Sequence, residues 1–146
     1  MVSMPAAVRA TSAGAAKSGG NARIGVMVIT VLIPINAVLT KLPAGHYNTD
    51  LGYALRQFVR DHTGSVDHRT TVIVLGDGRN NYNDPALGAV DEIKRRSRRL
   101  IWMNPEYPAQ WGTGDSDMDR YAPMCNDVHT VRNLKQLTDA IDSILG

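Results

Sequence analysis

Apolar residues along the chain fall into two kinds of segment. Short runs rich in Val, Ile and Leu at residues 24–33, 70–75 and 100–103 are almost continuously apolar, which is typical of strands buried on both faces. A further short strand is predicted over residues 127–131. Between these runs, apolar side chains recur every three or four residues, as on one face of a helix. The pattern therefore predicts an α/β fold with a mostly parallel sheet that is covered by helices on both faces.

The ends of three helices are predicted from polar residues and glycine. The first helix is expected to follow Thr49 as its N-cap and to stop at Gly64, and the second to follow Asp84. The third is expected to begin at Asn133, with Gln136 three residues later as in a capping box.

The N-terminal segment differs in composition from the rest. Residues 1–22 have few large apolar side chains and are expected to form a flexible basic tail, which leaves residues 23–146 as one domain. The apolar run at 24–33 is too short for a bilayer, which needs about 20 residues, although a targeting segment remains the alternative to a strand. Because that run is so short, we expect no membrane contact. The lone Cys125 allows no internal disulfide, which favours a reducing compartment, so we expect a cytoplasmic protein.

Charge is unevenly distributed along the 146 residues, whose net charge is +2. No Asp or Glu precedes Asp50, and the 4 charged side chains before it are all basic. This asymmetry suggests that the two parts of the chain have different structural histories.

Two polar loops lie where a parallel sheet binds its ligands. Residues 45–50 (Gly-His-Tyr-Asn-Thr-Asp) precede a helix and residues 76–81 (Gly-Asp-Gly-Arg-Asn-Asn) follow a strand, so both are expected at the carboxyl edge of the sheet. The Thr49 hydroxyl and the Asp77 carboxylate are hard oxygen donors, which Mg²⁺ and Mn²⁺ prefer. A helix cap and a turn explain the same two residues without any ligand.

Two charged clusters also have two interpretations. Asp115, Asp117 and Asp119 suit either a bound cation or the solvated face of a short helix. The basic residues at 94–99 suit either phosphate or the C-terminus of a helix, where cations offset the helix dipole. The structural interpretation is preferred for both, so no nucleic-acid partner is expected.

Four motifs in order resemble the CoxE-like branch of von Willebrand factor A (VWA) domains. They are Tyr-Asn-Thr-Asp-Leu-Gly at 47–52, Val-Leu-Gly-Asp-Gly-Arg-Asn-Asn-Tyr-Asn-Asp-Pro at 74–85, Trp-Met-Asn-Pro-Glu at 102–106 and Trp-Gly-Thr-Gly-Asp-Ser-Asp-Met at 111–118. The resemblance covers about residues 43–145, or the C-terminal two-thirds of such a domain. It implies a Rossmann-like three-layer α/β/α sandwich.

The resemblance also implies a metal-ion-dependent adhesion site. In this family one loop supplies Asp-x-Ser-x-Ser after the first central strand, a second supplies a Thr and a third an Asp; Thr49 matches the second element and Asp77 the third. No aspartate precedes Thr49, so the first element is missing, and the first central strand is expected to be missing or replaced by residues 24–33. Asp-His-Thr-Gly-Ser at 61–65 fits the related pattern Asp-x-Thr-x-Ser, but it is expected to be a helix stop. Mg²⁺ or Mn²⁺ is therefore expected to bind weakly or not at all.

The function implied by the resemblance is a non-enzymatic protein–protein interaction module. Its implied partner is a MoxR-type AAA+ ATPase, in an accessory role during metalloenzyme maturation. A sheet without its central strand would expose an edge, which favours self-association. Two alternatives stay open: a truncated or rearranged fragment without a working site, and a phosphate-handling enzyme that uses a metal on Asp77 with Arg79 as anion clamp.

Overall fold

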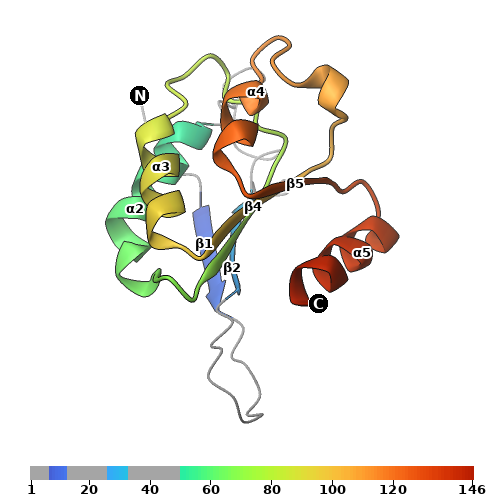
Figure 1. Cartoon of the computed structure of the whole chain (residues 1–146). Coiled ribbons are helices and arrows are strands. Elements are labelled where there is room, and N and C mark those ends of the chain that lie inside the picture. Colours follow the sequence, from blue (N-terminus) through green and yellow to red (C-terminus); the bar gives the residue numbers. More distant parts are fainter. Residues whose placement is uncertain (1–6, 13–25, 33–49) are drawn as a thin grey trace, which may run out of the picture.

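The computed structural model describes residues 7–12, 26–32 and 50–146, which form a five-stranded sheet between layers of helices (Figure 1). The strands lie side by side in chain order: β1 (Ala7–Ser12), β2 (Val26–Leu32), β3 (Thr71–Leu75), β4 (Arg99–Asn104) and β5 (Asp127–Thr130). β1 is antiparallel to β2, and the other neighbours are parallel. The predicted α/β fold with a mostly parallel sheet is confirmed.

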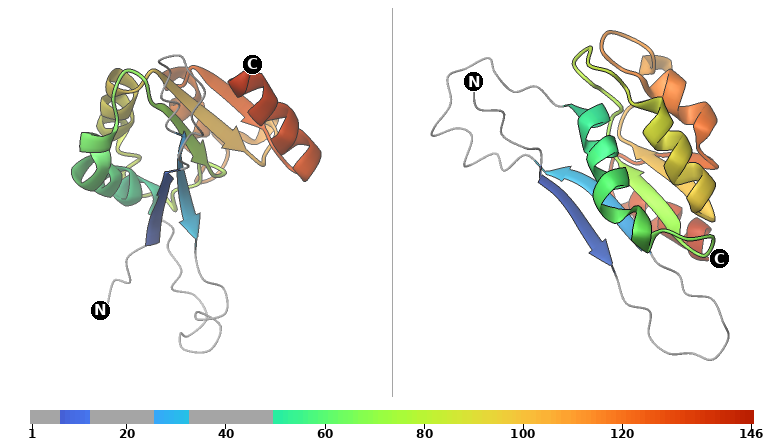
Figure 2. Two further views of the ribbon diagram at one scale, coloured as in Figure 1. Left: turned by 90° about the horizontal axis from the view of Figure 1, so that it is seen from below. Right: turned by 90° about the vertical axis from the view of Figure 1, so that its left-hand side faces the viewer.

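The helices form a layer on each face of the sheet (Figure 2). One face carries α2 (Leu51–His62), α3 (Leu87–Arg96) and the short α4 (Met118–Tyr121), and the other carries α5 (Leu134–Leu145). Single 3₁₀ turns lie at Thr63–Ser65, Pro108–Gln110 and Ala122–Met124. None of the helices in the described part of the chain is long and apolar enough to cross a membrane.

The strand predicted over residues 24–33 is present as β2. It pairs parallel with β3, so β2 covers the edge of β3 that a missing strand would have exposed, and β1 and β5 lie at the two edges of the sheet. β1 lies within residues 1–22, where a flexible tail was expected, and the structure differs there. The other residues of that segment lie outside the described residues, so the domain boundary at residue 23 stays a prediction. The expected self-association also stays a prediction.

Residues of β4 show why its sequence is continuously apolar. Leu100 and Trp102 pack in the cluster under α2 and α3, whereas Ile101 and Met103 pack in the cluster under α5, and all four are buried. Successive side chains of a strand point to opposite faces, and both faces of this sheet are covered. Trp102 also stacks on the buried Tyr121 with ring centroids 4.9 Å apart, so its ring is part of the core.

Two predicted helix starts are wrong, one by a single residue and the other by two residues. α2 is capped by Asp50 rather than Thr49, since the Asp50 carboxylate accepts the backbone N–H of the third helical residue at 2.7 Å. α3 begins at Leu87 rather than directly after Asp84, because Ala86 has a left-handed backbone with φ of 52°. Asp84 instead accepts the Ala86 N–H at 3.0 Å and caps a turn before the helix.

Gly52 marks the closest approach between α2 and the segment before α3. A Cβ atom there would lie 1.8 Å from the Asp84 carbonyl oxygen, whereas a Cβ at Gly88, also the second residue of its helix, meets nothing within 4 Å. We expect Gly52→Ala to lower the free energy of unfolding by about 3 kcal/mol, because the Asp84 backbone must move. Gly88→Ala should raise it by about 0.5–1 kcal/mol, since alanine is the better helix former. Urea unfolding measures both; similar effects of the two substitutions would contradict the close approach.

Candidate functional site

The candidate site lies at the carboxyl ends of β3 and β4, at the top of Figure 1. The chain leaves β3 through residues 76–86, and the backbone N–H of Gly76 donates to the Met103 carbonyl at 3.2 Å. The indole Nε1 of the buried Trp102 donates to the Gly76 carbonyl at 2.8 Å. The core therefore fixes the point at which this loop begins.

Asp77 is the first polar residue after β3. Its Oδ1 accepts the backbone N–H of Arg79 at 3.0 Å, which is the hydrogen bond of an Asx turn, and its carbonyl accepts from Asn104 Nδ2 at 3.0 Å. Asn104 is fully buried, and its Oδ1 accepts the Glu106 N–H at 2.7 Å. The turn interpretation of Asp77 is thus confirmed, while its second carboxylate oxygen has no hydrogen-bond partner among the residues that the structure describes.

The buried Asn80 joins this loop to α2. Its Oδ1 accepts the Gly52 N–H at 3.2 Å and its Nδ2 donates to the Asn83 carbonyl at 2.8 Å. The N–H groups in the first turn of a helix have no partner within the helix, so the Asn80 amide satisfies one of them. The start of α2 is therefore fixed to the loop that carries Asp77.

Arg79 joins segments that are far apart in sequence. Its Nε donates to Glu106 Oε1 at 2.9 Å and its Nη1 to Asp115 Oδ1 at 2.8 Å. The other Asp115 oxygen accepts the backbone N–H of Asn81 at 3.2 Å. The side chains are only 30% (Arg79), 20% (Glu106) and 21% (Asp115) exposed, so solvent screens these charge-assisted bonds less than those of a surface ion pair.

The ionisation of this cluster follows from the same contacts. Hydrogen bonds with Glu106 and Asp115 raise the pKa of Arg79, and the hydrogen bond from Arg79 holds the pKa of Asp115 below its usual 3.8. Arg79 and Asp115 therefore stay charged at neutral pH and neutralise each other. Arg79 is not available as the anion clamp that the enzyme alternative requires, and Asp115 is not available to a cation.

The loop held by Arg79 contains strained backbone. Asn81, Tyr82 and Ala86 all have left-handed φ values, of 49°, 60° and 52°. Asparagine adopts this conformation readily, but tyrosine and alanine do so rarely, at a cost of roughly 1–3 kcal/mol per residue. Tyr82 is in addition 83% exposed. The surrounding hydrogen bonds therefore hold the loop in a conformation that its own residues disfavour.

The structure locates one of the two predicted metal ligands. Asp77 lies at the carboxyl edge as expected, whereas Thr49 lies outside the described residues. Over the described ranges, no three His, Cys, Asp or Glu side chains form a group that could hold a metal ion. Asp77 fits the donor chemistry of Mg²⁺ with one carboxylate, so the described residues fit such an ion only in part.

The Asp-x-Thr-x-Ser string at residues 61–65 is a helix stop, as predicted. α2 ends at His62, the next three residues form a 3₁₀ turn, and Thr63 Oγ1 donates to the Val59 carbonyl at 2.7 Å. Because α2 begins beside Asn80, this string lies at the far end of the helix from Asp77.

The basic residues at 94–99 are largely engaged within the protein. Arg95 and Arg96 pair with acids one turn earlier in α3, and Arg99 pairs with Asp127 at 2.7 Å. Lys94 Nζ donates to Asn126. These contacts favour the structural interpretation of the basic cluster.

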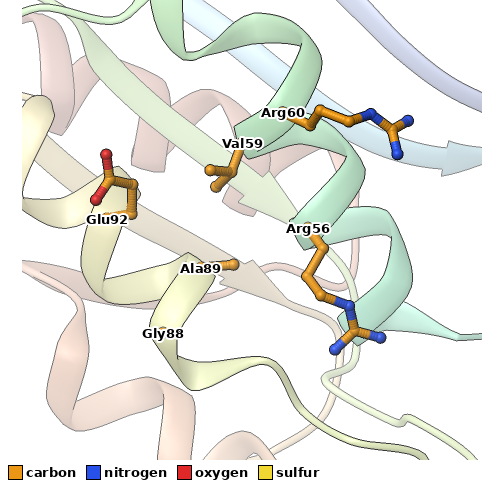
Figure 3. A pocket seen from close by; sticks show the side chains of 6 residues that line it. All are labelled: Arg56, Val59, Arg60, Gly88, Ala89 and Glu92. Atoms are coloured by element: carbon orange, nitrogen blue, oxygen red, sulfur yellow. The ribbon is translucent and has the colours of Figure 1, made fainter.

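A shallow depression of about 340 Å³ lies between α2 and α3 (Figure 3). Its charged lining residues already have partners: Arg56 pairs with Asp84, Arg60 with Asp61, and Glu92 with two arginines of α3. The depression therefore offers packing surface rather than polar groups for catalysis. The half-buried Cys125 is equally unsuited to nucleophilic chemistry, since burial raises the pKa of its thiol to about 12.

The residues that position the carboxyl edge of the sheet were not predicted in that role from the sequence. The sequence suggested Arg79 only as an anion clamp, and Asp115 as part of a cation site or of the solvated face of a short helix. Asn80 and Asn104 were not singled out. The only sequence signal for these two asparagines is their position. Asn104 ends a buried strand and Asn80 lies in the loop after another, where buried backbone groups need hydrogen-bond partners.

Comparison with known families matches residues 30–140 to the family described as VWA domain containing CoxE-like protein. The match begins within β2 and ends within α5, so it includes the end of β2 as well as the region of the four motifs. Neither a curated protein nor a solved structure matches the chain.

We expect Arg79→Met to lower the free energy of unfolding by about 2 kcal/mol at neutral pH, because Glu106 and Asp115 lose their partly buried counter-charge. The lowered pKa of Asp115 contributes stability above its usual value of 3.8, and this is lost as the pH falls through its lower value in the folded state. The deficit of the variant should therefore shrink below about pH 4. Urea unfolding at neutral and acidic pH tests this, with Arg69→Met at an exposed position as control. A deficit that is equal at both pH values would contradict the role of Arg79.

Proposed function

This chain belongs to the family of VWA domain containing CoxE-like proteins, and on that premise we propose that it is a non-enzymatic protein–protein interaction module. It binds its partner through the carboxyl edge of the sheet. The observation that carries this proposal is the joining of residues 76–86 to Glu106 and Asp115 through Arg79. Parallel α/β sheets bind ligands at this edge, and loops that are already ordered lose less conformational entropy on binding.

Asp77, together with Thr49, is the proposed ligand set for a weakly bound Mg²⁺ or Mn²⁺. The carboxylate oxygen of Asp77 that lies outside the Asx turn supports this assignment. When bound, the ion supplies positive charge and open coordination positions to an oxygen atom of the partner. Asn104 holds the backbone of Asp77, and Asn80 holds the start of α2 beside it. Thr49 and Asp77 would supply only two protein ligands, so the affinity for the ion should be low.

The proposed partner is a MoxR-type AAA+ ATPase of the cytoplasm, and the proposed role is accessory to metalloenzyme maturation. The support for this partner is membership of the CoxE-like family. Three charged groups at the edge, Asp50, Asp77 and Asp119, are acidic and have no ion-pair partner among the described residues, which disfavours nucleic acid.

The metal proposal is tested by thermal unfolding of the full chain with and without millimolar Mg²⁺ or Mn²⁺. A ligand at 100 times its dissociation constant adds about 2.7 kcal/mol, which corresponds to a rise in Tm of several degrees. We expect a rise in the wild type that is absent in Asp77→Ala.

The control is Asp61→Ala, which removes an exposed carboxylate at the far end of α2 and should keep the full rise in Tm. Loss of the response in the control instead would assign the metal to the Asp-x-Thr-x-Ser string. A cooperative transition that is indifferent to metal would leave an interaction module without a metal site, and the absence of any cooperative transition would favour the fragment alternative.

The partner proposal is tested by binding to a purified MoxR-type AAA+ ATPase from the same organism. We expect Asp77→Ala to weaken binding about tenfold or more, as for a central contact residue, and Asp61→Ala to leave it unchanged. Binding is measured by biolayer interferometry, and equal affinities of the wild type and Asp77→Ala would contradict the proposal that this edge contacts the ATPase.

A further inference from the structure

The loop that carries Asp77 also presents an exposed aromatic side chain. We propose that Tyr82 is the central contact residue of the partner-binding surface, and that the segment of the partner protein that covers it carries Arg or Lys side chains. This inference rests on the proposed function and adds the chemistry of the partner to it.

The exposure of Tyr82 is maintained against its backbone preference. Its side chain is 83% exposed, and it has a left-handed backbone directly after the left-handed Asn81. Strained positions of this kind persist where the surrounding structure holds them, and they cluster at functional sites. Here the hydrogen bond from the Asn81 N–H to Asp115, which Arg79 positions in turn, holds the strained pair.

A second exposed tyrosine lies at the start of α2, the helix end that Asn80 joins to this loop. Tyr53, in the first turn of α2, is 41% exposed. Its neighbour Gly52 donates to Asn80 and packs against the Asp84 carbonyl, and these two contacts flank Tyr82 in sequence. Tyrosine is enriched at the centre of protein–protein interfaces, because it buries a large rigid area at a small entropic cost.

The unpaired charges on this loop and at the start of α2, the two segments that Asn80 joins, indicate which partner fits. Asp77 on the same loop and Asp50 at the start of α2 have no ion-pair partner among the described residues. A guanidinium or ammonium group can contact the face of a tyrosine ring and a carboxylate at the same time. The chain itself provides an example at this edge, where Arg132 lies over the ring of Tyr107 at 4.6 Å from its centroid. Tyr82 has no such cation over its ring among the described residues.

The experiment uses the ¹⁵N-labelled full chain and two short capped peptides of glycine and serine, one containing arginines and the other glutamates. Amide chemical shifts are followed during titration without metal and again with Mg²⁺. The test variant is Tyr82→Asn, since asparagine tolerates the left-handed conformation and the fold should melt at or above the wild-type Tm. The matched control is Tyr107→Asn, whose ring is already covered by Arg132.

We expect the arginine peptide to perturb amides of residues 76–86 and the start of α2, with an affinity that falls about fivefold in Tyr82→Asn and less than about twofold in Tyr107→Asn. No binding of the arginine peptide, or binding that Tyr82→Asn leaves unchanged, overturns the inference. Binding of only the glutamate peptide, at residues 76–86 and only with Mg²⁺, also overturns it but leaves the proposed function standing. Failure of the proposed function is seen separately, as ATPase binding that is unaffected by Asp77→Ala.

Discussion

The guanidinium of Arg79 holds the carboxyl edge of this sheet together. It bonds to Glu106 at 2.9 Å and to Asp115 at 2.8 Å, so segments that follow two different strands converge on one cation. Two partly buried carboxylates without this cation would lose more in solvation and mutual repulsion than they gain in packing. The positions of the Asp77 loop, of the chain after β4 and of the turn at Asp115 therefore depend on one another.

This constraint explains how the edge can be both ordered and strained. Two buried asparagines extend the network, since Asn104 holds the Asp77 carbonyl and Asn80 holds the first turn of α2. Within this frame the loop keeps Tyr82 in a left-handed, exposed conformation. An interaction surface gains from such an arrangement, because little entropy remains to be lost when a partner binds.

Much of the fold could be predicted because its signals are local. Strand β4 reads as a continuous apolar run since both faces are covered, and Asn133 caps α5 as predicted, accepting the Gln136 N–H at 2.9 Å. The starts of α2 and α3 were misplaced because several residues near each start can cap a helix, and tertiary contacts select among them. Asp84 shows this: it pairs with Arg56 of α2 at 2.7 Å and caps a turn instead of the helix.

The sequence by itself determined the α/β class with a mostly parallel sheet and, through four motifs, the CoxE-like VWA family, because periodicity and motif spacing are properties of neighbouring residues. It also placed Asp77 at the carboxyl edge, since loops that follow parallel strands meet there. Only the tertiary structure decided which acids Arg79 contacts, 27 and 36 residues away along the chain. It likewise decided that Asn80 supports α2 and that Tyr82 stays exposed. Contacts between residues so far apart in sequence depend on how the sheet brings its loops together, and the local sequence around each residue does not determine that arrangement.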